Sequence, residues 1–311
     1  MNLNSKKNLF ALLLVLSPFV LFSEDKPEGN QYRAQDINVK TSLCQDCRFC
    51  PYMEVDIGYR HDMIRNSLEV YNPLWEITAS RKEKVDLVQL NFKAGAVICQ
   101  YVFIKGTVGY AFVNKNKESE ASYLKGTDYL INQYDIELKH GHAFDGLVGG
   151  GFRIPIYKQY AALDAEIGYD YKKINLKDAL TTRISSPYVG GTFYGSLGWN
   201  LQLTLFGSYF FDPAAQENSN LYLVKSKSFT PGPGFRTHHH ITAYKVGANL
   251  SYMFMDHLSI DLNWERFSGK TGTVYGSYDV NIQGNTEEGD FAAKLNYWIS
   301  NQYVVGIRYS F

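Results

Sequence analysis

The sequence predicts an all-β fold, a transmembrane antiparallel up-and-down β-barrel of about ten strands. Three observations support this. The chain holds 24 Tyr, 19 Phe and 26 Gly but only 5 Met and 9 Pro, which is typical of twisted antiparallel strands with aromatic girdles. Apolar and polar residues alternate over segments of roughly ten residues or more, the length that a tilted strand needs to cross a bilayer. The alternation continues to an aromatic final residue, Phe311.

The N-terminus has the pattern of an export signal. A pair of lysines precedes an almost unbroken apolar run over residues 9–22. A membrane anchor is the alternative, but the run is shorter than the ~20 residues that cross a bilayer, and Pro18 interrupts its end. We therefore expect residues 1–23 to be a signal peptide, cleaved after Ser23. Because no later run reaches ~18 consecutive apolar residues, the mature chain would enter a membrane only through strands.

Residues 24–51 are expected to form a polar periplasmic leader. They carry Cys44, Cys47 and Cys50 in a CxxCxxC run, and Cys99 follows far downstream. A zinc or iron–sulfur site normally needs four ligands within reach, and an exported segment meets an oxidising compartment, so we expect disulfides rather than a metal site. The odd number of cysteines in the run leaves room for a disulfide to another chain, and unpaired thiols remain an alternative.

Residues 52–311 are expected to form one barrel domain. At its start Val55, Ile57 and Tyr59 alternate with charged or small residues, which puts apolar side chains on one face of a strand. A soluble β-sandwich also alternates, but over strands of about five or six residues. We expect ten strands, near residues 52–62, 84–98, 100–113, 131–155, 159–174, 185–197, 199–212, 241–254, 257–267 and 290–311. Splitting the fourth at His140–Ala143 and the tenth at Ser300–Gln302 would give twelve, and an even number is expected either way.

The links between these strands alternate in length. Short links at residues 198–199 and 255–257 contrast with long polar segments at residues 114–130, 212–240 and 267–290. In an outer-membrane barrel the short turns face the periplasm and the long loops face outside. A sandwich gives no reason for this asymmetry.

The C-terminus resembles the recognition strand that the outer-membrane assembly machinery reads, although an edge strand of a soluble sheet is the alternative. We therefore expect export to the bacterial outer membrane, with outer-membrane lipid, lipopolysaccharide and the assembly machinery as partners. Removal of residues 1–23 takes away two lysines and no acid and leaves 29 basic against 31 acidic residues, so no nucleic-acid partner is expected. Apolar residues stand at every second position of the terminal strand: Tyr303, Val305, Ile307, Tyr309 and Phe311.

The polar faces of the strands should point into the barrel and carry both signs of charge. Such a lumen is either a polar transport path or a space filled by mutual ion pairs and water. A barrel of about eight strands is filled by its side chains, whereas open channels appear at about 16 to 18 strands, so ten strands favour the filled lumen. The expected lumen-facing charges are Glu54, Asp56, Arg60, Asp164, Glu166, Asp170, Lys245, Asp261, Glu265 and Arg308.

Parts of the chain resemble known families. From Ser186–Gly191 through Gly269–Gly272, and in the ending from Gly289, element order and loop length are similar to the second half of the omptin outer-membrane proteases. The first strand, Val55–Asp62, looks like that of a family of chlamydial (Protochlamydia-type) outer-membrane proteins of unknown role. Together they imply a chlamydial relative on an omptin-like ten-stranded barrel over residues 52–311, with strands that project beyond the membrane.

The omptin resemblance implies peptide hydrolysis by a D-x-D pair facing a D-x-H pair, in which an acid-poised histidine activates water. The counterpart of the first pair here is Gly126–Tyr129, which keeps only Asp128, and that of the second is Gln216–Ser219, which holds no histidine. His238 and His240, with His239 between them, are the alternative candidates. Consecutive side chains on a strand point to opposite faces, so these histidines do not converge easily on one metal ion.

Three functional hypotheses follow. The first is a structural or surface-interaction protein without catalysis and without cofactor or metal. The second is an omptin-like endopeptidase with a rearranged site, using Asp128, His238 and His240. The third is a narrow porin-like channel. No sequence feature identifies an external ligand.

Overall fold

The computed structural model describes residues 49–311 except 73–74, 99–100, 139, 158–160, 178, 224–227, 232–233, 239, 256 and 283–284. All described residues belong to one compact unit, residues 37–311. The predicted signal peptide and nearly all of the predicted leader lie outside the described residues. Because β1 begins at Phe49, the end of that leader already belongs to the first strand.

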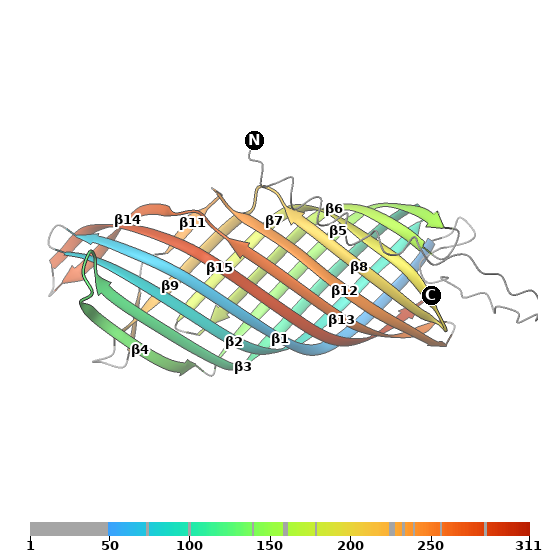
Figure 1. The fold of residues 1–311 in the computed structure, drawn as a ribbon, viewed down its shortest axis with the longest axis horizontal. Coiled ribbons are helices and arrows are strands. Elements are labelled where there is room, and N and C mark those ends of the chain that lie inside the picture. The colour runs from blue at the N-terminus through green and yellow to red at the C-terminus, as the bar shows by residue number, and fades with distance from the viewer. Residues whose placement is uncertain are drawn as a thin grey trace, which may run out of the picture. The chain divides into compact units, whose positions relative to one another are not determined.

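Ten strands close into a barrel in which each neighbouring pair is antiparallel (Figure 1). The ring closes because the first strand pairs with the last, from Tyr52 opposite Ser310 to Tyr71 opposite Asp290. This confirms the predicted all-β barrel of ten strands. In ring order the strands are β1 (Phe49–Asn72), β2 (Trp75–Ile98), β3 (Val102–Leu124), β5 (Gly141–Tyr157), β6 (Ala161–Leu176), β7 (Leu180–Gly198), β8 (Leu201–Phe210), β12 (Thr242–Met255), β13 (Leu258–Lys270) and β15 (Asn285–Ser310).

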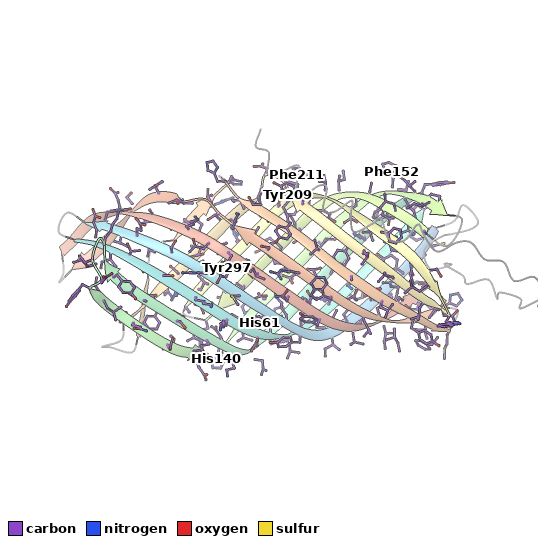
Figure 2. The ribbon with its side chains drawn as sticks, viewed as in Figure 1. His61, His140, Phe152, Tyr209, Phe211 and Tyr297 are labelled. Carbon is purple, nitrogen blue, oxygen red and sulfur yellow. The ribbon has the colours of Figure 1, made fainter. Side chains whose placement is uncertain are left out.

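The alternating apolar and polar residues of the strands point to the outside and the inside of the barrel, respectively. On β1, Val55 and Ile57 point outward and are 49% and 60% exposed, whereas Glu54, the residue before Val55, points inward and is 1% exposed. We call the outward row of exposed apolar residues the apolar band; it runs around the ring, and Figure 2 shows two of its aromatic members, Phe152 and Phe211, at the outline of the barrel. A surface of this kind fits lipid outside and a polar interior.

Tight turns join the ring strands at the end that carries the C-terminus. Between β7 and β8 only Trp199 and Asn200 are left, with φ of 50° and 61°. Positive φ at both central residues is the requirement of the two-residue hairpin turn whose twist matches that of the strands. By the asymmetry of outer-membrane barrels, this end faces the periplasm and the opposite end faces outside.

The long polar segments that were predicted as external loops are largely strands, so that prediction was wrong in its detail. β3 continues to Leu124 and β4 (Leu130–Leu138) returns beside it, while β14 (Val274–Ile282) pairs with the outer part of β15. β9 (Ala214–Leu223), β10 (Ser228–Pro231) and β11 (Phe235–Thr237) lie between β8 and β12 in the chain. In Figure 1, β4 and β14 lie at the end opposite the C-terminus. Beyond the apolar band neither strand face meets lipid, so the period-two pattern that reveals strands is lost.

The twelve-strand alternative is also wrong. The predicted strand at residues 131–155 does divide, into β4 and β5, but both pieces pair with β3 and only β5 belongs to the ring. The predicted strand at residues 290–311 does not divide, because β15 runs unbroken from Asn285 to Ser310. None of the described residues forms a helix long and apolar enough to cross a bilayer.

Candidate functional site

The barrel interior has three levels, and the one nearest the periplasmic turns is a polar chamber of about 220 Å³. Glu54 lines this chamber and is bound by two cations. Its carboxylate accepts hydrogen bonds from Lys93 at 2.7 Å and from Arg308 at 2.9 Å. Lys93 also contacts Asp56, at 2.6 Å, and Arg308 contacts Asp261, at 3.2 Å. One network therefore joins four neighbouring strands of the ring, β2, β1, β15 and β13, along the inner wall.

A second ionic group lies deeper in the barrel around Arg60, which is fully buried. Its guanidinium donates to Asp62 at 2.6 Å and to Asp145 at 2.8 Å, and Lys172 lies 3.3 Å from Asp145. Lys245 contacts Asp170 at 2.5 Å. Removing one partner of such a buried pair typically costs about 3–5 kcal/mol, because the other charge is left without compensation.

Of the ten charges predicted to face the lumen, Glu265 and Arg308 are half-buried, and the other eight are buried inside the barrel at 7% exposure or less. Each has a partner of opposite charge on another position of the wall. Arg153 forks onto Asp164 with two bonds of 2.7 Å, and Lys105 pairs with Glu166. The charges therefore hold one another across strands.

The middle level is an aromatic layer, formed by Tyr188, Phe210, Phe267 and Trp298, each at most 2% exposed. Successive rings meet edge to face, with centroid separations of 6.1, 5.8 and 5.7 Å. Such T-shaped pairs are favourable beyond the area they bury. Aliphatic side chains, among them Ile64, pack into the same cluster. This layer was not predicted from the sequence, although each of its members stands at an inward position of the alternation.

The aromatic layer contacts the ionic group around Arg60 on its periplasmic side. The indole Nε1 of Trp298 donates to Asp62 at 3.3 Å, and the ammonium of Lys172 lies 5.3 Å from the ring centroid of Phe267. A cation over a ring face is attracted by the ring quadrupole. The apolar layer and the ion pairs therefore support each other.

The outermost level lies beyond the apolar band, and we call it the outer cluster: Arg81, Glu83, Glu118, Glu120, Tyr134 and Glu217. Arg81 lies 2.5 Å from Glu118 and 3.6 Å from Glu83. The hydroxyl of Tyr134 on β4 lies 2.8 Å from carboxylate oxygens of both Glu118 and Glu120 and can donate its proton to either one. One guanidinium thus forms ion pairs with several carboxylates.

Burial alters the acidity of this cluster. Glu217, on β9, is 6% exposed, and burial raises its pKa to about 8, with Arg81 opposing that rise. Burial, and then the neighbouring Glu118, raise the pKa of Glu83 well above its ordinary value. Glu120 and Glu217 line a small cavity of about 30 Å³ together with Asn66 and Ser219. That volume suffices for one or two waters and not for a peptide.

The residues proposed for peptide hydrolysis are placed apart from this cluster. Asp128 is exposed in the turn between β3 and β4, and His238 and His240 are exposed between β11 and β12. None of the interactions among the described residues joins Asp128 to either histidine. His239 lies outside the described residues. Glu217 alone, of the segments named from the resemblance, enters the outer cluster.

The terminal strand faces lipid as its pattern predicts. Tyr303, Val305, Ile307 and Tyr309 are outward and 39 to 58% exposed, and the ring of Tyr309 meets that of Phe311 edge to face at 4.8 Å. The backbone N–H of Phe311 donates to the carbonyl of Pro51 at 3.1 Å. The last residue is therefore anchored to the first strand.

Of the cysteines, Cys50 at the start of β1 is disulfide-bonded. Cys44, Cys47 and Cys99 lie outside the described residues. Among the described residues, no group of three or more His, Cys, Asp or Glu side chains has the arrangement to hold a metal ion.

The comparisons with known proteins agree with this architecture. The family model described as Protochlamydia outer membrane protein matches residues 54–272. The crystal structure of the outer membrane protease OmpT from Escherichia coli has a TM-score of 0.60 at 10% identity, covering 84% of this chain and 97% of OmpT. The β domain of the Bordetella autotransporter BrkA (TM-score 0.35, 10% identity, 85% and 99% covered) and a Pseudomonas aeruginosa FadL homologue (0.29, 8%, 83% and 90%) are more remote. No curated protein matches in sequence. The likeness to OmpT shows a shared fold.

Proposed function

Because this chain belongs to the Protochlamydia outer membrane protein family and its strands close into a barrel, we propose that it acts as a non-conducting, non-catalytic structural or surface-interaction protein of the outer membrane. It reaches that membrane after signal-peptide export. The barrel anchors the molecule, and the strands beyond the apolar band form the part that meets the outside.

The observation that carries this proposal is the aromatic layer. Its four rings are buried and successive rings are in contact, and they belong to a larger buried apolar cluster. The polar chamber and the small cavity of the outer cluster share no lining residue, which supports an apolar level between them. An ion that passes this level would have to leave water and the charged walls behind, which is costly in an apolar surrounding. A lumen closed in this way supports anchoring rather than transport.

Planar bilayer recording tests the closed lumen. The purified, folded chain should give no steady conductance, whereas Phe267→Ala with Trp298→Ala removes two adjoining rings and should introduce conductance steps. Tyr303→Ala, on the outward face, is the matched control and should remain silent. Regular single-channel steps from the parent protein would overturn the proposal in favour of the narrow pore.

The absence of catalysis rests on the placement of the candidate residues. A positioned general base typically contributes 10²–10⁴-fold to such a reaction. Here Asp128, His238 and His240 are exposed, and no interaction among the described residues joins Asp128 to either histidine, while several carboxylates are buried around Arg81. We expect no turnover of fluorogenic dibasic peptides by the refolded protein with lipopolysaccharide. Turnover abolished by Asp128→Ala, or by removing residues 238–240, would show a rearranged enzyme instead.

The second candidate function is an omptin-like endopeptidase that works with glutamates, and one observation favours it. Glu118 and Glu120 form an acid-x-acid pair on β3, and Glu217 of β9 shares a cavity with Glu120. The same peptide assay separates this candidate from the first. Turnover that is lost in Glu120→Gln and in Glu217→Gln, but kept in Asp128→Ala, would establish it.

A further inference from the structure

The outward face of β1, β2 and β3 carries four cations next to one another, and we call them the basic patch: Arg65, Lys82, Lys84 and Lys117. They alternate with the buried residues of the outer cluster, so their side chains point away from the barrel. Arg65 stands directly opposite Lys82, and Lys84 stands directly opposite Lys117. In Figure 2 the labelled His61 lies on the same strand as Arg65, and the labelled Tyr297 is the partner of Arg65 on β15.

Like charges directly opposite one another on neighbouring strands are destabilising, since their Cβ atoms are about 4.5–5.5 Å apart. Here two such pairs adjoin. In the part of the chain that the structure describes, none of the four side chains has an ion pair or hydrogen bond with another residue. Three acids stand near the patch. Glu137, opposite Lys117 on β4, lies 3.8 Å from Lys115, and Asp86 bonds His61 at 2.6 Å. Asp135 is exposed on β4 opposite Ser119, which is the partner of Lys82. Among the described residues, none of these acids forms an ion pair with a cation of the patch.

The position of the basic patch along the barrel indicates the level of the membrane at which it lies. It begins at Lys84, two outward positions beyond Val88 on β2, and at Arg65, three outward positions beyond Tyr59 on β1. Other outward cations stand on the same side of the band, such as Lys173 opposite Arg183. On the periplasmic side of the band, no outward-facing lysine or arginine occurs among the described residues. The cations are thus matched to the headgroup level of one leaflet.

We propose that the basic patch binds the phosphate groups of a phosphorylated glycolipid of the outer leaflet. A single-phosphate headgroup would meet one cation pair, whereas a glycolipid with two phosphates on one sugar backbone can neutralise both adjoining pairs. Lysine and arginine are the usual phosphate partners, and their hydrogen bonds are strengthened by the charge. This inference goes beyond the closed lumen and does not depend on it.

The experiment uses the folded full-length chain in neutral detergent, with bisphosphorylated lipid A, monophosphoryl lipid A and phosphatidylglycerol as probes. The variants are Lys84→Gln with Lys117→Gln, and Arg65→Gln with Lys82→Gln. Lys177→Gln with Lys270→Gln is the control, since both lysines are exposed at the outer end outside the patch and the charge change is the same. Binding and the thermal unfolding midpoint are measured for each combination.

Bisphosphorylated lipid A should bind the parent and the control equally and raise their unfolding midpoints. Each patch variant should bind it on the order of tenfold more weakly, because two charge-assisted contacts are lost. Without lipid the patch variants should unfold at the parent temperature or above it, since a like-charge pair has been relieved. Equal binding by patch variants and parent, equal weakening in the control, or equal binding of phosphatidylglycerol would each overturn the proposal. A midpoint lowered in lipid-free detergent would also overturn it, by showing that the lysines are structural.

Discussion

At the scale of single residues, the buried Glu217 should make the stability of the barrel depend on pH. Its pKa is raised by burial from an ordinary 4.5 to about 8. Between these values the folded protein holds a proton that the unfolded chain has released. Stability from this residue is therefore fully present below pH 4.5 and is lost as the pH rises through about 8.

Glu217→Gln should remove this dependence. At pH 9 the variant should be more stable than the parent, by up to about 5 kcal/mol, and near pH 4 the two should be equal. Chemical unfolding of the folded barrel at both pH values measures the difference, and Glu137→Gln, at an exposed position of β4, is the control. Parallel stability curves for parent and Glu217→Gln over this range would contradict the assignment.

A second residue-scale expectation concerns Arg60, which compensates Asp62 and Asp145 at once. Arg60→Met keeps much of the volume but leaves two buried carboxylates short of a partner, so we expect a loss of about 3–5 kcal/mol in unfolding free energy. Lys270→Gln, at an exposed end, should change stability by less than about 0.5 kcal/mol. A variant as stable as the parent would show that Lys172 suffices for Asp145.

At the scale of elements, β15 joins the two ends of the chain and presents the predicted assembly signal. Tyr309→Ala with Phe311→Ala removes two outward rings that contact each other, so insertion should slow by several-fold while the barrel, once formed, stays closed. Phe152→Ala with Ile154→Ala is the control, because these exposed apolar residues lie on β5, away from the terminus. The measurement is the amount of protease-resistant barrel over time. Normal accumulation of the Tyr309→Ala, Phe311→Ala variant would contradict the role of the terminal strand as an assembly signal.

The same elements show what the sequence predicts and what it leaves out. Alternation located the lipid-facing part of nearly every ring strand, because there one face meets lipid and the other meets ion pairs. It failed where β3 passes Lys115. There Asn116 and Glu118 face inward while Lys117 points outward, so both faces are polar and polarity no longer distinguishes them. For that reason the Glu118–Glu120 pair was taken for loop and missed as part of the site.

At the scale of the whole molecule, the first expectation is location. The mature chain should begin at Glu24 and fractionate with the outer membrane, because the lysine pair, the apolar run and the terminal strand act in succession. Mass spectrometry of the N-terminus and membrane fractionation check both parts. Recovery of the mature chain from the soluble periplasm would remove the basis for every proposal above.

The aromatic layer belongs to the whole molecule and could not be predicted from the sequence. Strand number favoured a filled interior, but Tyr188, Phe210, Phe267 and Trp298 come from four strands. Their contact depends on the stagger between neighbours, which a single sequence does not state. The likeness to omptins predicted ring size and strand overhang, and it did not predict the aromatic layer.

The pairing of β1 with β15 sets the order in which the barrel is made. Most ring neighbours are joined by short links, so hairpins form locally and quickly, whereas this seam joins residues that are nearly the full chain apart. Closing so long a loop is slow, because its entropy is lost before any seam contact forms. Until β15 arrives, β1 keeps an open edge that invites pairing with other chains. Speed of synthesis and supply of assembly factors, rather than final stability, then govern the yield of closed barrels.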